Sequence, residues 1–249
     1  DPVGLRSSPT PAGLQDVESA DQPNATSPAA GDWLPPSAAF TPAEIPRLFE
    51  ADSPLLRRHA PYTISGYRLF RELTDTDGAI PASIKALMIA VAAVARNRDD
   101  LARRELARGK GLGLEIGQAV AGLIVLSSLR GEGAALTFER LLEEVYGPAE
   151  PAEPVAQVPV AEGEARQNFE TYFGQIPVPL QVMLDLVPRG ADAYYLMRRG
   201  SIDANPLSPK HGEFLLLTIL AADYSPMTAT HVRGARNAGA TDEEIAEAF

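Results

Sequence analysis

His231 is the side chain in this sequence best suited to proton transfer near neutral pH. The chain has three histidines and no cysteine. Histidine changes its charge between about pH 5 and 8, so it can serve as a general acid or base. Tyr224 and Met227 precede His231 by two turns and one turn of a predicted helix, which predicts one shared face. We therefore expect acid–base chemistry at His231, with Tyr224 as a second proton donor; the alternative is a histidine buried for packing alone.

Three further side chains could complete such a site. Glu213 lies on the preceding predicted helix and could orient His231, because a carboxylate that binds one ring nitrogen selects the tautomer. Arg233 and Arg236 follow His231 on its own helix and could bind a substrate carboxylate. The alternative for Glu213 is a solvated residue near a helix end.

Local signals predict three helices in the last forty residues of the chain. An apolar run at 214–222 indicates that the first of these helices is buried. The helix boundaries are marked by Ser208-Pro209 and Ser225-Pro226 before the first two helices, Gly239 after the second, and a capping box of Thr241 and Glu244 before the third.

The pattern H-x-x-x-A-x-x-x-G-x-T-x-E-E-I in this region resembles the carboxymuconolactone decarboxylase and AhpD-like family. It is formed by His231, Ala235, Gly239, Thr241, Glu243, Glu244 and Ile245. AhpD-like members of that family work through C-x-x-C-x-x-x-H, and here the two cysteine positions fall on Tyr224 and Met227, with His231 retained. Thiol–disulfide exchange requires a thiolate, so a peroxidase or disulfide reductase of the AhpD kind is excluded.

The decarboxylase branch of the family requires neither cysteine, metal nor cofactor. The resemblance implies a cofactor-independent lyase or isomerase that acts on a small carboxylated lactone or ketone-like substrate. His231 would be the acid or base, assisted by Tyr224 and Glu213. Family members with one unit form rings of three or six subunits, so a homo-oligomer, a dimer or trimer of this chain, is expected. The alternative is a non-catalytic subunit or binding protein of the same fold.

The helical signals of the C-terminal region recur earlier in the chain at a constant offset of 128 residues, which predicts an internal duplication. We expect an all-α protein in which two tandem AhpD-like units, residues 41–146 and 167–249, form a pseudo-dimer. A Pro/Ala/Glu-rich linker at 147–166 would join them. The second copy reaches only the point equivalent to Val120. The matched pairs are Pro81 with Pro209, Tyr67 with Tyr195, Ala107 with Ala235 and Gly111 with Gly239.

The first copy does not repeat the histidine. At the same offset its cysteine positions fall on Arg96 and Asp99, and its histidine position falls on Arg103. Arg96 and Arg103 could form a carboxylate or phosphate pocket, or they could belong to a solvent-exposed helix with i,i+4 charge pairs. A third interpretation, which we prefer, is that the first copy has lost its site and serves as a packing partner.

The net charge and the apolar stretches of the chain limit the kinds of molecule that it is expected to bind. The formal charge of −11 and the pI near 4.8 argue against nucleic-acid binding. The most apolar stretch, 116–129, is shorter than the ~20 residues that a membrane-spanning helix needs, and no signal peptide opens the chain. A soluble cytoplasmic protein with a small anionic substrate is therefore expected.

Residues 1–40 are rich in Pro, Ser, Ala and Gly and are predicted to be a disordered tail or, around Trp33-Leu34, a docking segment.

Overall fold

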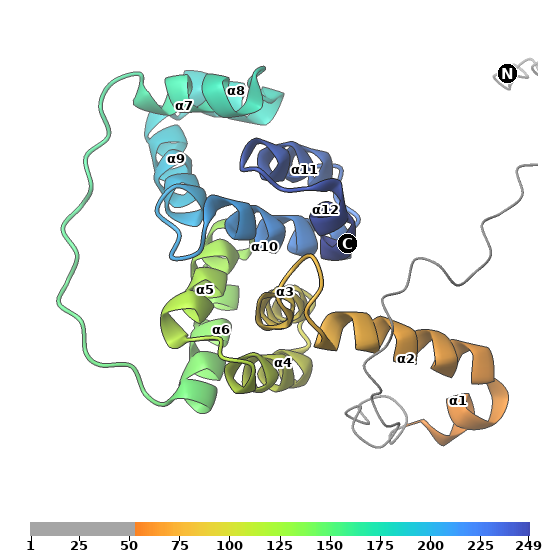
Figure 1. Ribbon diagram of the computed structural model, residues 1–249. Helices are drawn as coiled ribbons and strands as arrows, with labels where there is room; N and C mark the ends of the chain where they lie inside the picture. Colours follow the sequence, from red (N-terminus) through yellow and green to blue (C-terminus); the bar gives the residue numbers. More distant parts are fainter. Residues whose placement is uncertain (1–52) are drawn as a thin grey trace, which may run out of the picture. The chain divides into compact units, whose positions relative to one another are not determined.

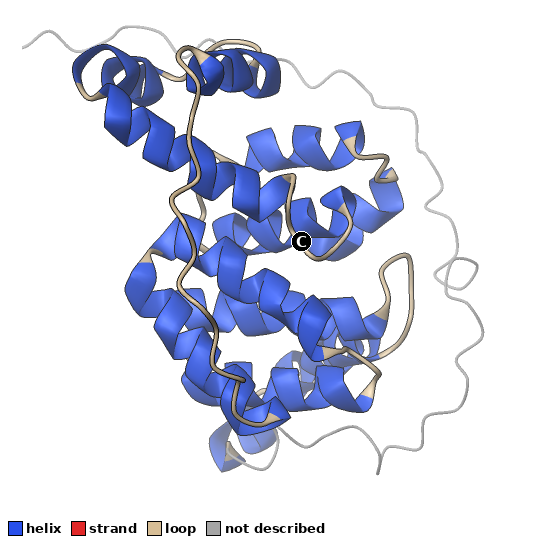
Figure 2. Cartoon of the chain, turned by 90° about the vertical axis from the view of Figure 1, so that its left-hand side faces the viewer, coloured by secondary structure: helices blue, strands red, loops and turns tan. Residues whose placement is uncertain are grey.

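The computed structural model describes residues 53–249, and all the regular structure among them is helical (Figure 2). The predicted all-α class is confirmed. The predictions for the tail at 1–40, for Trp33-Leu34 and for the first residues of the unit at 41–146 lie outside the described residues. The helices are α1 (Pro54–His59), α2 (Pro61–Asp75), α3 (Ala82–Ala95), α4 (Asp99–Gly111), α5 (Ile116–Arg130), α6 (Glu132–Tyr146), α7 (Glu164–Phe173), α8 (Val178–Leu186), α9 (Pro188–Ile202), α10 (Pro209–Ala222), α11 (Thr228–Asn237) and α12 (Asp242–Ala248).

The predicted caps at Ser208 and Thr241 and the glycine at 239 mark helix boundaries near the C-terminus, whereas α11 begins at Thr228 and not after the predicted Ser225-Pro226 signal. The Ser208 hydroxyl accepts a hydrogen bond from the backbone N–H of His211 at 3.3 Å, and α10 begins at the next residue, Pro209. Thr241 and Glu244 form the predicted capping box at the start of α12. Gly239 follows α11 with a φ of +87°, the left-handed conformation that glycine adopts without a steric penalty.

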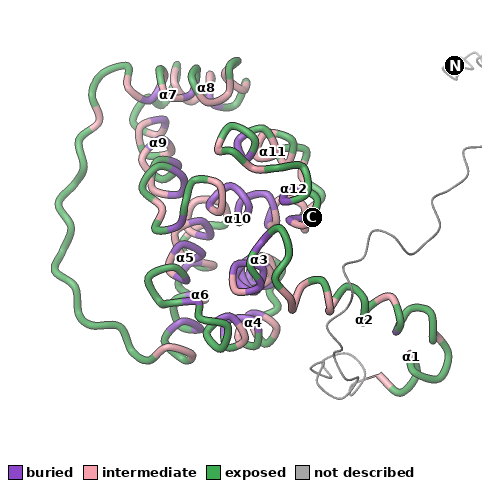
Figure 3. Tube along the Cα trace, viewed as in Figure 1, coloured by how far each residue is buried: buried purple, intermediate pink, exposed green. Residues whose placement is uncertain are grey.

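Two apolar helices, α3 and α10, form the centre of the main core. Most of their side chains are buried, and the two helices pack against each other (Figure 3). One continuous cluster of buried residues includes Leu87 and Val91 of α3, Leu126 of α5, and Phe214 and Leu217 of α10. The two halves of the chain therefore share the main core.

A smaller cluster holds α7, α8 and α9 together. Its buried members are Ala165, Phe169, Leu180, Ala191 and Tyr195. Ile202 at the end of α9 and Tyr172 of α7 pack against the main core instead. These contacts bring α7 and α9 to the helices that carry Glu213 and His231.

The connection between α6 and α7 is exposed and has no helix until Glu164 (Figure 1). The linker predicted at 147–166 is therefore three residues shorter, because Glu164, Ala165 and Arg166 form the first turn of α7. Within residues 53–249, no helix combines the length and apolarity that a bilayer-spanning segment needs.

The helices α2 and α3 match α9 and α10 in length and in the backbone geometry of several of their ends. The helices α2 and α9 both have 15 residues, and α3 and α10 both have 14. Ala60 and Val187, which precede α2 and α9, have nearly the same backbone angles (φ −134°, ψ 58° and φ −140°, ψ 62°). Asn97 and Tyr224, which follow α3 and α10, have φ values of 56° and 55°.

The match of helix ends pairs residues of the two halves differently from the constant offset of 128 residues taken from the sequence. Pro81 is the N-cap of α3 and matches Ser208, the N-cap of α10, rather than Pro209. Gly113, with a φ of +88°, matches Gly239, whereas Gly111 is the last residue of α4. The match of helix ends supports the predicted duplication, and the pseudo-dimer stays a prediction.

Candidate functional site

Glu213 of α10 and His231 of α11 form a polar pair in which Glu213 is buried and His231 is partly buried. The carboxylate oxygen Oε2 of Glu213 lies 2.7 Å from Nδ1 of His231, and the side chains are 3% and 11% exposed. The apolar neighbours of Glu213 along α10 hold its carboxylate away from solvent. When Nδ1 donates its hydrogen bond to the carboxylate, the opposite nitrogen, Nε2, is left for a reacting group.

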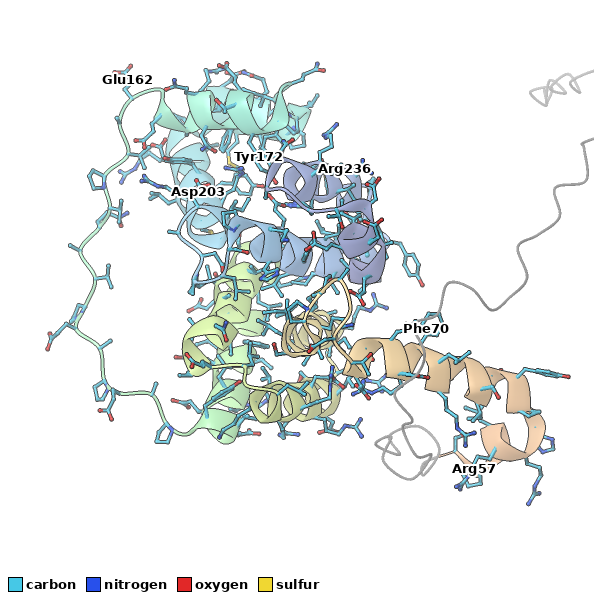
Figure 4. The ribbon with its side chains drawn as sticks, in the orientation of Figure 1. Arg57, Phe70, Glu162, Tyr172, Asp203 and Arg236 are labelled. Carbon is cyan, nitrogen blue, oxygen red and sulfur yellow. The ribbon has the colours of Figure 1, made fainter. Side chains whose placement is uncertain are left out.

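Tyr172 of α7 is a third member of this cluster. Its hydroxyl donates a hydrogen bond to Oε1 of Glu213 at 3.0 Å and lies 3.4 Å from Nδ1 of His231. Figure 4 shows Tyr172 between α7 and α11. Burial, reinforced by the neighbouring Glu213 carboxylate, raises the pKa of Tyr172 far above its usual range. The phenol is therefore neutral and serves as a donor to Glu213.

Gly234, nearly one turn after His231 in α11, makes room for the Glu213 carboxylate. A Cβ atom on Gly234 would lie 2.5 Å from Oε1 and 2.7 Å from Oε2 of Glu213. Only glycine therefore allows α10 and α11 to approach this closely while the carboxylate keeps its position.

Arg198 of α9 lies on the other side of Tyr172. Its guanidinium carbon is 3.5 Å from the centre of the Tyr172 ring, and its Nη1 donates to Oδ1 of Asn168 at 2.5 Å. The residue is 6% exposed, and Nε is enclosed without a hydrogen-bond partner. No carboxylate of the described residues forms an ion pair with Arg198, in contrast to most of the other buried charges.

The arrangement can hold and move a proton at His231. Glu213 fixes the ring and stabilises its protonated form, and Tyr172 fixes Glu213. Within the part of the chain that the structure describes, no group of three or more His, Asp or Glu side chains could hold a metal ion.

The structure separates Tyr224 from His231, contrary to the predicted shared face. The helix α11 begins only at Thr228, and Tyr224 lies before it in the left-handed conformation. Its side chain is 92% exposed. The spacing argument assumed a helix running through Tyr224, and the turn after α10 breaks that register. Tyr172, from a helix far earlier in the chain, occupies the place next to His231 that we predicted for Tyr224.

The four arginines predicted to bind substrate have other surroundings. Arg236 pairs with Asp242 at 2.8 Å on the surface, and Arg233 is exposed on the same helix. Arg96 lies 3.5 Å from Asp223. None of these three side chains forms a hydrogen bond or ion pair with His231 or Glu213, and neither does Arg103.

Arg103 belongs to a surface network in the first copy. It pairs with Asp100 at 2.9 Å and with Glu144 at 2.6 Å, as the alternative interpretation of a charged surface helix predicts. When α4 and α11 are aligned on Gly113 and Gly239, the residue matching His231 is Glu105 rather than Arg103.

Glu105 lies in a closed network of four charges. Its carboxylate is 1% exposed and lies 2.7 Å from both Arg71 and Arg108. Asp75 completes the network, at 3.0 Å from Arg71 and 3.2 Å from Arg108. At the position that this alignment pairs with His231, α4 therefore carries a carboxylate paired with two arginines.

The sequence interpretation missed Tyr172, Arg198 and Gly234. One signal was available for Arg198. When the sequence is aligned on Pro61 and Pro188, the first residues of α2 and α9, Arg198 is paired with Arg71. The position of Tyr172 depends on how α7 packs over α10 and α11, and no local pattern predicts that.

Two cavities in the described part of the chain lie away from the Glu213–His231 pair. One of about 660 Å³ is lined by the end of α3, the start of α4 and residues of α5 and α6, including Arg98, Arg104 and Arg130. The other, of about 690 Å³, lies against α7 and α8 and includes Arg166 and Gln181.

The C-terminal helices are similar in sequence to a known protein family. Residues 188–249 match the model of the carboxymuconolactone decarboxylase family, which confirms the resemblance over α9 to α12. A crystal structure from Burkholderia xenovorans LB400, provisionally named a gamma-carboxymuconolactone decarboxylase subunit, is similar in fold. Its TM-score is 0.54 at 23% sequence identity, over 78% of this chain and 79% of that chain. No curated protein matches the chain in sequence.

Proposed function

We propose that this chain, which matches the carboxymuconolactone decarboxylase family over its last helices, is a cofactor-independent lyase or isomerase. Its substrate would be a small carboxylated lactone or ketone-like acid. The observation that carries the proposal is the contact of the buried Glu213 carboxylate with the partly buried His231 ring, 2.7 Å from Oε2 to Nδ1. The name of the structural relative favours a decarboxylase-like reaction.

The proposed reaction is a decarboxylation followed by protonation at carbon. The C–C bond to the carboxylate breaks, CO₂ leaves, and the electron pair remains on the substrate as an anion delocalised into its carbonyl group. His231, protonated on both nitrogens, then donates the Nε2 proton to that carbanion. Glu213 holds Nδ1 at 2.7 Å throughout and stabilises the charged ring before the transfer. An isomerase would use the same residue twice, first as base and then as acid.

Tyr172 acts through Glu213 as a positioning residue. Its neutral hydroxyl occupies Oε1 of the carboxylate at 3.0 Å, which leaves Oε2 directed to the histidine. Since burial raises the pKa of Tyr172, its hydroxyl stays protonated through the neutral and mildly alkaline range.

A second candidate function is a non-catalytic subunit of the same fold. It is favoured by the two cavities that lie away from His231 and by the description of the structural relative as a subunit. In this case the histidine would hold α10 and α11 together. Assembly into a homo-oligomer would suit both functions and is part of the proposal.

The test combines a turnover assay with NMR of the histidine rings. Release of CO₂ from a panel of carboxylated γ-lactones and β-keto acids is measured for the wild type, His231→Gln and Glu213→Gln. Each substitution is expected to lower kcat by about 10² or more, the usual contribution of a general acid or base. His59→Gln, at an exposed residue of α1, is the matched control and should leave kcat unchanged.

The NMR measurement separates the two functions. In an enzyme the His231 resonance shifts when a carboxylated lactone is added, and the His59 resonance does not. A His231 resonance that ignores every compound in the panel, together with no CO₂ release, would contradict the enzyme and favour the non-catalytic subunit.

A further inference from the structure

Arg198 is a buried cation for which the described residues provide no counter-ion. Moving a charge out of water is unfavourable unless an opposite charge or several hydrogen bonds replace the lost hydration. Arg198 donates a hydrogen bond to Asn168, its guanidinium lies over the rings of Tyr172 and, at 5.8 Å, of Phe173, and its Nε has no acceptor among the described residues. Stacking on an aromatic ring offsets part of the cost but leaves the N–H groups unsatisfied.

The first copy shows how the same position is neutralised. Arg71 and Arg198 hold the same place in α2 and α9, counted from the prolines that open these 15-residue helices. Arg71 has two carboxylate partners, Asp75 at 3.0 Å and Glu105 at 2.7 Å.

Neither carboxylate is present in the second copy. The residue that matches Asp75 is Ile202, the last residue of α9, and the residue that matches Glu105 is His231. An arginine with two acidic partners in one copy therefore corresponds to an arginine that pairs with no carboxylate of residues 53–249 in the other.

We propose that a carboxylate of the substrate is the missing partner of Arg198, and that the first copy binds no substrate because Asp75 and Glu105 already neutralise Arg71. This inference rests on the proposed function and identifies the anchoring residue of that site. Nε and a terminal nitrogen of Arg198 would hold the carboxylate in the bidentate geometry that guanidinium groups favour.

The geometry joins this anchor to the proton donor. The face of the Tyr172 ring contacts the Arg198 guanidinium, and the hydroxyl of the same ring binds Glu213. The centres of the Tyr172 and His231 rings are 6.4 Å apart. A carboxylate bound at Arg198 would thus be separated from the His231 ring by the ring of Tyr172.

The most direct test introduces a carboxylate side chain next to Arg198. Ile202→Asp places a carboxylate four residues after Arg198, as Asp75 stands after Arg71, and should neutralise the arginine within the chain. Ile202→Asn has nearly the same shape without the charge and is the matched control. Arg198→Met removes the anchor, and Arg198→Lys keeps the positive charge.

The readout is binding rather than turnover. Calorimetry would measure the affinity of a carboxylated γ-lactone and of its uncharged methyl ester for each folded variant. We expect one molecule of the acid bound per chain. Ile202→Asp and Arg198→Met should each weaken acid binding about 10-fold or more, the range of a lost charged hydrogen bond. Ile202→Asn and Arg198→Lys should weaken it less, and ester binding should be equal in all variants.

Several results would contradict the proposal that Arg198 binds the substrate carboxylate. They are equal affinity for acid and ester in the wild type, equal losses in Ile202→Asp and Ile202→Asn, unchanged binding in Arg198→Met, or no acid binding at all. Should Ile202→Asp fail to fold, the comparison of Arg198→Met with Arg198→Lys decides. Failure of the proposed enzyme is distinguishable: the acid would still bind at Arg198, including in His231→Gln, but no CO₂ would be released.

Discussion

At the scale of single residues, Gly234 shows how closely the site depends on one missing methyl group. The carboxylate of Glu213 lies where a Cβ atom on Gly234 would be, and the same carboxylate sets the orientation of His231. The requirement for glycine here comes from the neighbouring helix, since the residue lies inside α11, where alanine would otherwise be preferred.

We predict that Gly234→Ala displaces the Glu213 side chain and lowers kcat by about 10-fold or more, because the hydrogen bond to His231 is lost or lengthened. The matched control is Gly117→Ala in α5, where an added Cβ meets no atom within 4 Å. That variant should keep full activity and gain up to about 1 kcal/mol in the free energy of unfolding. Unchanged kcat in Gly234→Ala would show that the carboxylate position is not required.

At the scale of helices, the ends of α3 and α10 carry the same unusual residue conformation. Asn97 and Tyr224 both have a positive φ, and in each turn the following residue bonds back to the last turn of the helix (Arg98 to Ala93 and Ser225 to Leu220). Asparagine tolerates this conformation, whereas tyrosine adopts it at a cost.

We predict that Tyr224→Gly raises the free energy of unfolding by about 1 kcal/mol, because glycine adopts a positive φ without strain. Urea unfolding would measure the change. Tyr224→Ala is the control, since it removes the exposed ring and retains most of the strain. Both variants should keep full activity. A loss of activity in both would return Tyr224 to the site as the proton donor that its distance from His231 in sequence first indicated.

At the scale of the whole described region, the two halves of the chain are joined by one core and one exposed connection. Residues 148–161 have no regular structure and are nearly all exposed, while the buried cluster includes residues from α3 to α6 and from α9 to α12. The covalent connection therefore contributes little to holding the halves together once they have folded.

We predict that cutting this connection leaves the protein assembled. A recognition site for a specific protease would be inserted after Ala156, and the uncut insertion variant would be the control. After cleavage the two fragments should elute together in size-exclusion chromatography with an unchanged circular dichroism spectrum. Fragments that separate without denaturant would show that the halves are independent units.

Much of the helical architecture could be predicted because its signals are local. The Ser208-Pro209 cap, the capping box of Thr241 and Glu244, and the glycine at 239 act on residues a few positions away, so the sequence alone determined where these helices begin and end. The pairing of Glu213 with His231 was also predictable, because α10 and α11 are consecutive helices joined by a short turn.

Only the tertiary structure decided which other side chains surround this pair. Tyr172 and Arg198 come from α7 and α9, and their positions depend on how those helices pack over α10 and α11. The turn before α11 places Tyr224 outside that helix and exposed, and aligning the glycines after α4 and α11 pairs His231 with Glu105 instead of Arg103. Local caps depend on neighbouring residues, whereas the composition of a site depends on helix packing, and one sequence does not by itself reveal that packing.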